Sequence, residues 1–491
     1  MGVIDVLEPY IVRMPSVSRP EKHVPFKRKL TWTLGVLVLY FALTNVTVYG
    51  ADVQGDLFGQ FRSVLAGAQG SVLHLGIGPI VTASIVLQLL DGSDLLPFDT
   101  SEPRGQALYQ GSQKVLVVLM SILTAAPMVA TGFLTPRADL GLSVGAVAWI
   151  VFLQVALGGV IILYLDEIIS KWGIGSGVGL FIVAGVSQQM VGGIFDWHSD
   201  PSAELAELPV GLLFRWYHIA TGQSPLGTEF AATSSEGFWF LMTYGGQILF
   251  VITTILVFAI IVYAESVRVE IPLSHSRVKG ARGRYPVKLI YASVLPLIFV
   301  RAIQANFQML GQVLYSRGFD PEWFAVYDQG VAQSGIMWYL TPVYRPEDWM
   351  WWLPTGPTQE VHQVLLRLGV DLTFLMVGGA IFAVFWVESA DMGPGAVAQQ
   401  IQRSGMQIPG FRRNPGVIEK VMERYIPPIT ILSGILIGLI AALANLLGTI
   451  GGVDGLGLLL AVSITYKLYE EIAEEQMMEM HPMMRRMFGQ E

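Results

Sequence analysis

The sequence contains no cysteine, which excludes disulfides, thiol nucleophiles and thiolate metal sites. Charged residues are also few: they make up 14% of the 491 residues, whereas hydrophobic residues make up 53%. A soluble domain of ordinary composition carries about 25% charged residues. This chain therefore has more apolar surface than a soluble domain can bury, and we expect it to lie in a membrane.

Motifs of catalysis and nucleotide binding are missing as well. The sequence has no P-loop, HExxH or GxSxG, and its seven histidines are scattered mostly through the expected loops. We therefore expect no enzyme activity, no catalytic residues, no metal site and no cofactor.

Ten stretches are apolar enough to cross the hydrocarbon core, which needs roughly 20 residues per helix. They lie near 31–49, 73–90, 113–133, 144–165, 178–195, 245–264, 288–310, 371–387, 428–447 and 456–472. The expected fold is an all-α polytopic membrane protein of two five-helix halves. Its parts are an amphipathic N-terminus (1–30), an N-terminal half (31–195), an external loop (196–244), a C-terminal half (245–472) and a tail (473–491).

Basic residues are distributed unevenly between the two sides of this bundle. With the N-terminus inside, most lysines and arginines fall on the inner side; those in outer segments are Arg62, Arg137, Arg215, Arg317, Arg345 and Arg367. Cytoplasmic loops are enriched in Lys and Arg. We therefore expect both termini, and the long loops 265–288 and 388–426, in the cytoplasm.

Two pairs of segments indicate an internal repeat. Residues 173–184 (GIGSGVGLFIVA) and 451–462 (GGVDGLGLLLAV) both begin G-x-x-x-G-x-G-L, and Pro79 aligns with Pro296. Because five is odd, two five-span halves insert with opposite orientation, and a pathway is expected at their interface. Chance matching in a glycine-rich chain is the alternative explanation.

The polar residues of the expected spans weigh against ion-coupled transport. No aspartate or glutamate lies in the middle of a span, and the charged residue found there is Arg301. An ion-coupled transporter ordinarily needs an acidic group near the midplane. A secondary transporter built on an inverted repeat is kept as the alternative function.

Aliphatic residues cluster near the axis of the repeat instead. Residues four apart on a helix share one face, which pairs Ile77 with Val81 and Val178 with Ile182. The repeat adds Ile298 and Leu460. A ring of such side chains can exclude water and ions and still widen around a passing chain. Ordinary helix packing is the other explanation.

Five segments of the chain form long, ordered motifs. They are LGIGPIVTASIVLQLL (75–90), YLDEIISKWGIGSGVGLFIVAGVSQ (164–188), YAESVRVEIPLSHSRVKGARGRYPVK (263–288), FWVESA (385–390) and RYIPPIT (424–430). These segments resemble the archaeal SecY family, the large subunit of the protein-conducting translocon. The resemblance covers nearly all ten spans and both large inner loops. It implies a channel in the cell (plasma) membrane that passes unfolded polypeptides and releases transmembrane segments sideways into lipid.

The resemblance also assigns roles to residues. It implies a pore ring of Ile77, Val81, Val178, Ile182, Ile298 and Leu460. It implies a lateral gate with Thr82, Gln88 and Asn306, in which Thr124 replaces an acidic residue of some relatives. A plug near 54–67 would contain Asp56, Leu57, Phe58, Phe61, Val64 and Leu65. Arg301 we expect to pair with Asp52 or Asp56, unless it extends to the outer interface.

The partners are implied in the same way. Loops 265–288 and 388–426 would bind the ribosome through Arg277, Lys279, Arg282, Arg284, Arg412 and Arg413. The small subunits SecE and Sec-beta, the nascent chain, the signal recognition particle receptor and membrane lipids are the other expected partners, and DNA is not. Setting the topology of the chain is the alternative role of these basic residues.

Overall fold

The structure is a computed structural model. It describes residues 11, 14–22, 24–53, 66–92, 103–130, 134–199, 208–221, 234–275, 282–292, 294–318, 321–328, 331–390, 392–403, 406–407 and 415–480. The chain forms two compact units. Unit 1 comprises Met1–Ser187, Gln329–Val331 and Ile464–Glu491, and unit 2 comprises Gln188–Asp328 and Ala332–Ser463.

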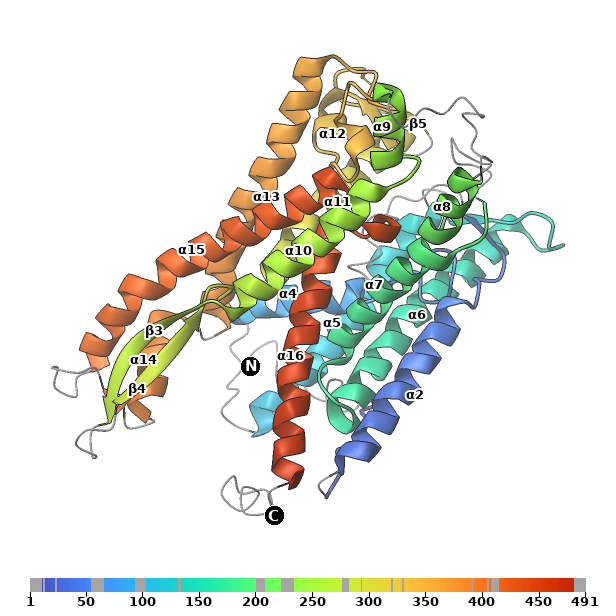
Figure 1. Cartoon of the computed structure of the whole chain (residues 1–491). Helices are drawn as coiled ribbons and strands as arrows, with labels where there is room; N and C mark the ends of the chain where they lie inside the picture. The colour runs from blue at the N-terminus through green and yellow to red at the C-terminus, as the bar shows by residue number, and fades with distance from the viewer. Residues whose placement is uncertain are drawn as a thin grey trace. The chain divides into compact units, whose positions relative to one another are not determined.

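Unit 1 is built mainly of long helices (Figure 1). Its elements are α2 (Phe26–Thr44), β1 (Ala51–Val53), α4 (Gly78–Gly92), α5 (Pro103–Ala130), β2 (Leu134–Pro136), α6 (Val144–Trp172), the first part of α7 (Gly177–Phe195) and the last part of α16 (Gly455–Met480). Strands β1 and β2 pair antiparallel. Apolar residues of α5 and α6, among them Met128, Val147 and Val151, form a buried cluster that also contains Leu75.

Unit 2 combines long helices with smaller elements. They are α8 (Leu212–Ala220), α9 (Ser235–Met242), α10 (Ile248–Ser266), β3 (Arg268–His275), β4 (Arg282–Lys288), α11 (Leu295–Ser316), β5 (Val326–Asp328), β6 (Val331–Ser334), α12 (Gly335–Tyr339), η1 (Pro346–Asp348), α13 (Val361–Ser389), α14 (Pro394–Arg403), β7 (Met406–Gln407), α15 (Pro415–Leu447) and η2 (Ile450–Gly452), followed by the first part of α16.

Helices α13 and α15 run side by side in unit 2 (Figure 1). A Cβ on Gly379 would lie 2.7 Å from the carbonyl oxygen of Gly434, and a Cβ on Gly434 would lie 2.5 Å from that of Gly379. Small residues let helix backbones approach closely in a membrane. These two glycines therefore set the close crossing of the two helices.

Each of the ten predicted spans overlaps one helix of the described residues, and the predicted all-α membrane fold is confirmed. The ten helices are α2, α4, α5, α6, α7, α10, α11, α13, α15 and α16. In the part of the chain that the structure describes, six helices are long and apolar enough to cross a membrane by length and composition alone, and Gly78–Gln88 is a shorter apolar helix.

Some predicted boundaries were wrong. Helix α13 begins at Val361 and α15 begins at Pro415, ten or more residues before the predicted spans 371–387 and 428–447. Helix α15 continues through Pro427 and Pro428, where the prediction placed its start. Transmembrane helices tolerate proline because neighbouring groups satisfy the freed backbone atoms.

The N-terminal segment before α2 contacts α5 and α6 near the ends that are expected to face the cytoplasm. Residues 14–22 form no helix. Lys114 Nζ donates to the carbonyl of Pro15 at 3.2 Å, and Lys171 Nζ donates to that of Val17 at 2.6 Å. The predicted amphipathic helix lies almost entirely outside the described residues and stays a prediction.

Candidate functional site

The entrance to α4 is a sharp break in the chain. Gly76 has φ +54°, a left-handed conformation that glycine adopts without steric cost, and α4 begins two residues later at Gly78. Pro79 is the second residue of the helix, where its missing N–H leaves no hydrogen bond unmade. The break places Ile77, which is fully buried, directly before the helix.

Two adjacent glycines of α6 make room for this entrance. A Cβ on Gly158 would lie 1.8 Å from the carbonyl oxygen of Val72, and a Cβ on Gly159 would lie 2.4 Å from Ser121 Oγ and 3.5 Å from Pro79. The backbone before α4 therefore packs directly on α6. Sequence reasoning missed this contact; the GG pair inside an apolar span was the available signal.

Helices in the two units begin at equivalent residues of the repeat. Helix α7 begins at Gly177 and α16 at Gly455, which are aligned residues. Helices α4 and α11 each begin one residue before their aligned prolines, Pro79 and Pro296. The paired helices thus begin at aligned residues of the repeat, although the predicted spans for α4 and α11 began earlier, at 73 and 288.

A polar side chain of the preceding helix caps the start of both α7 and α16. Asp166 Oδ1, on α6, accepts a hydrogen bond from Val178 N at 2.8 Å. Asn445 Oδ1, on α15, accepts one from Gly455 N. Helix N-termini carry amide donors without an intrahelical partner. The same device therefore fixes both helices at their first turn.

Each of the six predicted ring residues lies within about two turns of the start of one of these four helices. Four of them are buried: Ile77, Ile182, Ile298 and Leu460. Val81 and Val178 are half-buried. Unit 1 contains the four ring residues of the N-terminal half, and unit 2 contains Ile298 and Leu460. None of the six is an exposed side chain.

The predicted gate residues differ in their surroundings. The Thr82 hydroxyl donates to the carbonyls of Gly78 at 2.9 Å and Pro79 at 3.2 Å, so it binds its own helix. The Thr124 hydroxyl likewise donates to its own helix, to Met120 O at 2.7 Å. Asn306 is exposed on α11, and Gln88 is half-buried on α4.

A hydrogen bond that sequence reasoning missed joins α4 to α5. Gln113 Nε2 donates to Ser84 Oγ at 2.8 Å. This bond holds the helix that carries Thr82 against its neighbour within unit 1.

The predicted plug residues 54–65 lie outside the described residues, but both flanks of that segment are anchored. Before it, β1 pairs with β2. After it, Ala66 is fully buried, and its carbonyl accepts a hydrogen bond from the Tyr40 hydroxyl at 2.8 Å. The Tyr40 ring stacks on Phe181 of α7, with ring centroids 4.9 Å apart. The second anchor therefore rests on the helix that carries Val178 and Ile182.

The structure gives Arg301 a partner that sequence reasoning did not name. Arg301 Nη1 donates to Asp371 Oδ1 of α13 at 2.9 Å. Asp56 lies outside the described residues, and the expected pairing with Asp52 or Asp56 stays a prediction. Only 1% of the Arg301 surface is exposed, which excludes extension to the interface. Asp371 was missed because the predicted span began at that residue, whereas α13 carries it three turns into the helix.

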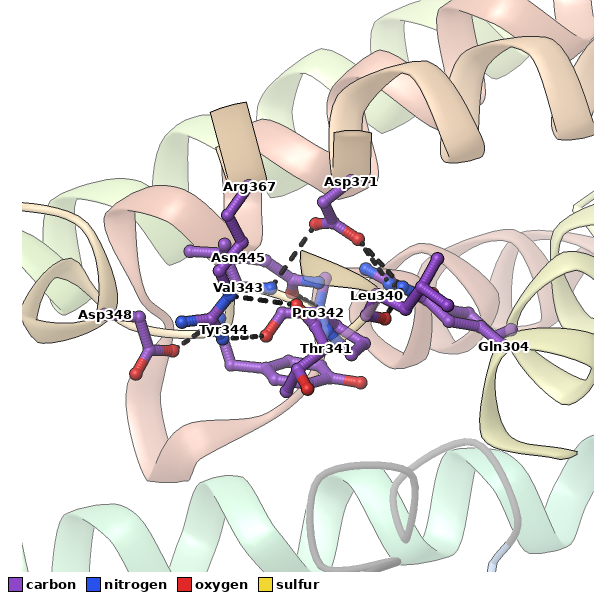
Figure 2. A network of polar contacts seen from close by, with 12 residues as sticks. Gln304, Leu340, Thr341, Pro342, Val343, Tyr344, Asp348, Arg367, Asp371 and Asn445 are labelled. Carbon is purple, nitrogen blue, oxygen red and sulfur yellow. Dashed lines mark hydrogen bonds and ion pairs between the residues drawn. The ribbon is translucent and has the colours of Figure 1, made fainter. Parts of the chain in front are cut away.

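Asp371 belongs to a buried polar network in unit 2 (Figure 2). Gln304 Nε2 donates to the carbonyl of Leu340 at 3.0 Å, and Arg367 donates to those of Thr341 at 3.0 Å and Pro342 at 2.9 Å. The carbonyls of residues 340–342 are thus bound by side chains of α11 and α13. Buried backbone carbonyls need such partners.

The two predicted docking loops are joined by β-structure rather than being irregular. Strand β3 pairs with β4 and also with β7, in which Ser274 lies opposite Gln407. Arg284 forms an exposed ion pair with Glu270 of the facing strand. Arg282 is the first residue of β4. The other four predicted docking residues, Arg277, Lys279, Arg412 and Arg413, lie outside the described residues.

Comparison with known proteins identifies the family. A profile described as SecY matches residues 71–469, and a second, described as the plug domain of Sec61p, matches residues 38–70. The chain belongs to the SecY family. The protein translocase subunit SecY of Halobacterium salinarum is 59% identical over 100% of this chain and 99% of that protein. That of Methanocaldococcus jannaschii is 38% identical over 97% of this chain and 98% of that protein.

Solved SecY and Sec61 structures share the fold. One, described as the structure of a protein conducting channel, has a TM-score of 0.76 at 37% identity and covers 97% of this chain and 98% of its own. Sec61 in the canine ribosome-channel complex has a TM-score of 0.73 at 36% identity, with the same coverage. The SecY-family chain is thus a multi-pass membrane protein and a protein-conducting channel subunit. The alternative of a secondary transporter is not supported.

Proposed function

We propose that the chain is the pore-forming subunit of a Sec channel in the cell membrane, with both termini in the cytoplasm. Unfolded polypeptides pass between its two halves, and apolar segments leave sideways into lipid. The observation that carries the proposal is the position of the six ring residues. They lie at the starts of four helices that begin at matching residues of an internal repeat.

The ring acts as an adaptable seal. Aliphatic side chains form no hydrogen bonds with water or ions, so a closed ring of them excludes both by remaining dry. The same side chains bind no particular residue of a passing chain. A polypeptide of any sequence can therefore slide through, and the ring closes behind it.

The flanking segments complete this mechanism. The plug, residues 54–67, seals the outer side of the ring at rest; its support is that the described residues on either side of it are fixed to unit 1. Thr82, Gln88 and Asn306 line the lateral gate between α4 and α11. Thr82 already binds its own helix, so it offers little resistance to separation of the gate helices.

Energy for transport comes from a partner, because the sequence holds no nucleotide-binding motif. The ribosome is the proposed partner for the joined loops 265–288 and 388–426, whose lysines and arginines meet RNA phosphates. SecE and Sec-beta complete the channel, and the signal recognition particle receptor delivers ribosomes to it. The support is that one similar structure is a Sec61 ribosome-channel complex.

Site-specific crosslinking tests the pore. A photoreactive amino acid at Ile77 or Ile298 should crosslink to a stalled nascent chain in the assembled channel. The same amino acid at Val38 or Ile381, side chains that are 68% and 61% exposed on α2 and α13, should crosslink to lipid and not to the nascent chain. Equal crosslinking at all four positions would contradict the proposed ring.

Salt dependence tests the docking surface. The double substitution R277E/K279E should weaken ribosome binding and lower the slope of log affinity against log salt by about one per lost phosphate contact. Substitution R137E, on the side expected to face outward, is the control and should leave both quantities unchanged. An unchanged slope in R277E/K279E would remove these residues from the interface.

A further inference from the structure

Unit 2 buries an arginine and its counterion inside a bundle of membrane helices. Arg301 is 1% exposed and Asp371 is 4% exposed. Replacing a buried ion pair by apolar residues of similar volume is often neutral or stabilising, whereas removing one partner is strongly destabilising. Stability alone therefore does not account for this ion pair, and its contacts indicate another role.

Arg301 contacts more than its counterion. Its Nη1 donates to Asp371 Oδ1 at 2.9 Å and to Gln304 Oε1 at 2.6 Å, and its guanidinium lies 5.5 Å from the centre of the Tyr344 ring. Its Nε and Nη2 have no hydrogen-bond partner among the described residues. The arginine of α11 is thus paired with a carboxylate of α13.

The ion pair lies next to a predicted ring residue. Arg301 follows Ile298 by three residues on α11, so both side chains lie on one face of that helix. Asp371 lies on α13. Helix α11 packs closely on α13 here: a Cβ added to Gly378 of α13 would lie 3.0 Å from the Val300 side chain of α11.

We propose that Arg301 is a positioning residue of the pore ring: through Asp371 it fixes α11 to α13, and so holds Ile298 in place. The inference rests on the proposed function, since it assigns Arg301 a role only if Ile298 forms part of the ring. Loss of the guanidinium frees α11 to rotate or slide on α13, which loosens the seal without removing any ring side chain.

The test is resting ion conductance of the complete channel in proteoliposomes, measured together with its thermal midpoint. R301M leaves Asp371 without a counterion and should lower the midpoint and raise the conductance. The double variant R301M/D371L removes both charges and should recover the midpoint, yet its conductance should stay raised by about tenfold. R301K keeps the positive charge but lacks the planar, forked guanidinium group. Its conductance should fall between those of R301M and the unchanged protein.

Arg367 supplies the matched control. It is 7% exposed on α13, and among the described residues it donates to the carbonyls of Thr341 and Pro342 and lies over the Trp338 ring. R367M should lower the midpoint and leave the resting conductance unchanged, which separates loss of a buried arginine from loss of the positioning role. A raised conductance in R367M equal to that of R301M would overturn the inference.

A ring variant separates failure of the inference from failure of the proposed function. I298G should raise the resting conductance directly. If I298G conducts and R301M/D371L stays as tight as the unchanged protein, the inference is wrong and the ring stands. If I298G leaves the conductance unchanged, the ring itself is wrong and the role of Arg301 falls with it.

Discussion

Replacing Gly158 by alanine should destabilise the protein, although the same change usually stabilises a helix. Alanine exceeds glycine in helix propensity by about 1 kcal/mol. At Gly158 the added carbon would lie 1.8 Å from the Val72 carbonyl oxygen, whereas ordinary contact begins at 3.4 Å. The two backbones must then separate by roughly 1.5 Å, and overpacking of this kind costs about 1–3 kcal/mol or more. We expect a net loss near the top of that range.

Gly145 provides the control on the same helix. A Cβ there meets nothing within 4 Å, so G145A should leave stability unchanged or raise it by up to about 1 kcal/mol. The assay is the thermal midpoint of the purified channel in detergent, with resting conductance as a second measurement. G158A should also raise the conductance, since Val72 leads into the break before Ile77. A midpoint for G158A equal to or above that of G145A would refute the reasoning.

Two further substitutions test buried polar groups. Glu167 accepts hydrogen bonds from Lys114 and Lys171, each at 2.7 Å, so E167Q should lower the free energy of unfolding by about 1–3 kcal/mol. The control is E270Q, at an exposed ion pair, which should change the free energy of unfolding by less than about 1 kcal/mol. Equal effects of the two substitutions would contradict the reasoning. Burial raises the pKa of Tyr327 to about 12. The stability that the neutral Tyr327 contributes is therefore fully present below the usual tyrosine pKa, and it is lost as the pH rises through the raised pKa. Y327F should remove that part of the loss of stability at alkaline pH when thermal midpoints are compared from about pH 9 to pH 12. Identical profiles for Y327F and the unchanged protein would disprove the role of Tyr327.

The sequence alone predicted the helices and the residues at which the paired helices begin, because both depend on local patterns. Apolar runs of sufficient length specify spans whatever surrounds them. The glycines before α7 and α16, and Pro79 and Pro296, mark where helices begin, since backbone conformation near them is set by the residue itself. The four helix starts therefore agree with the aligned repeat.

Contacts between distant segments required the tertiary structure. Nothing in the local pattern joins Arg301 to Asp371, 70 residues away, and a span predicted to begin at Asp371 concealed that the carboxylate is buried. The approach of Val72 to Gly158 and the pairing of β3 with β7 have the same origin. Periodicity reports which face of a helix is apolar, but the neighbour that covers a given residue depends on how helices cross, and that is decided only when the chain packs.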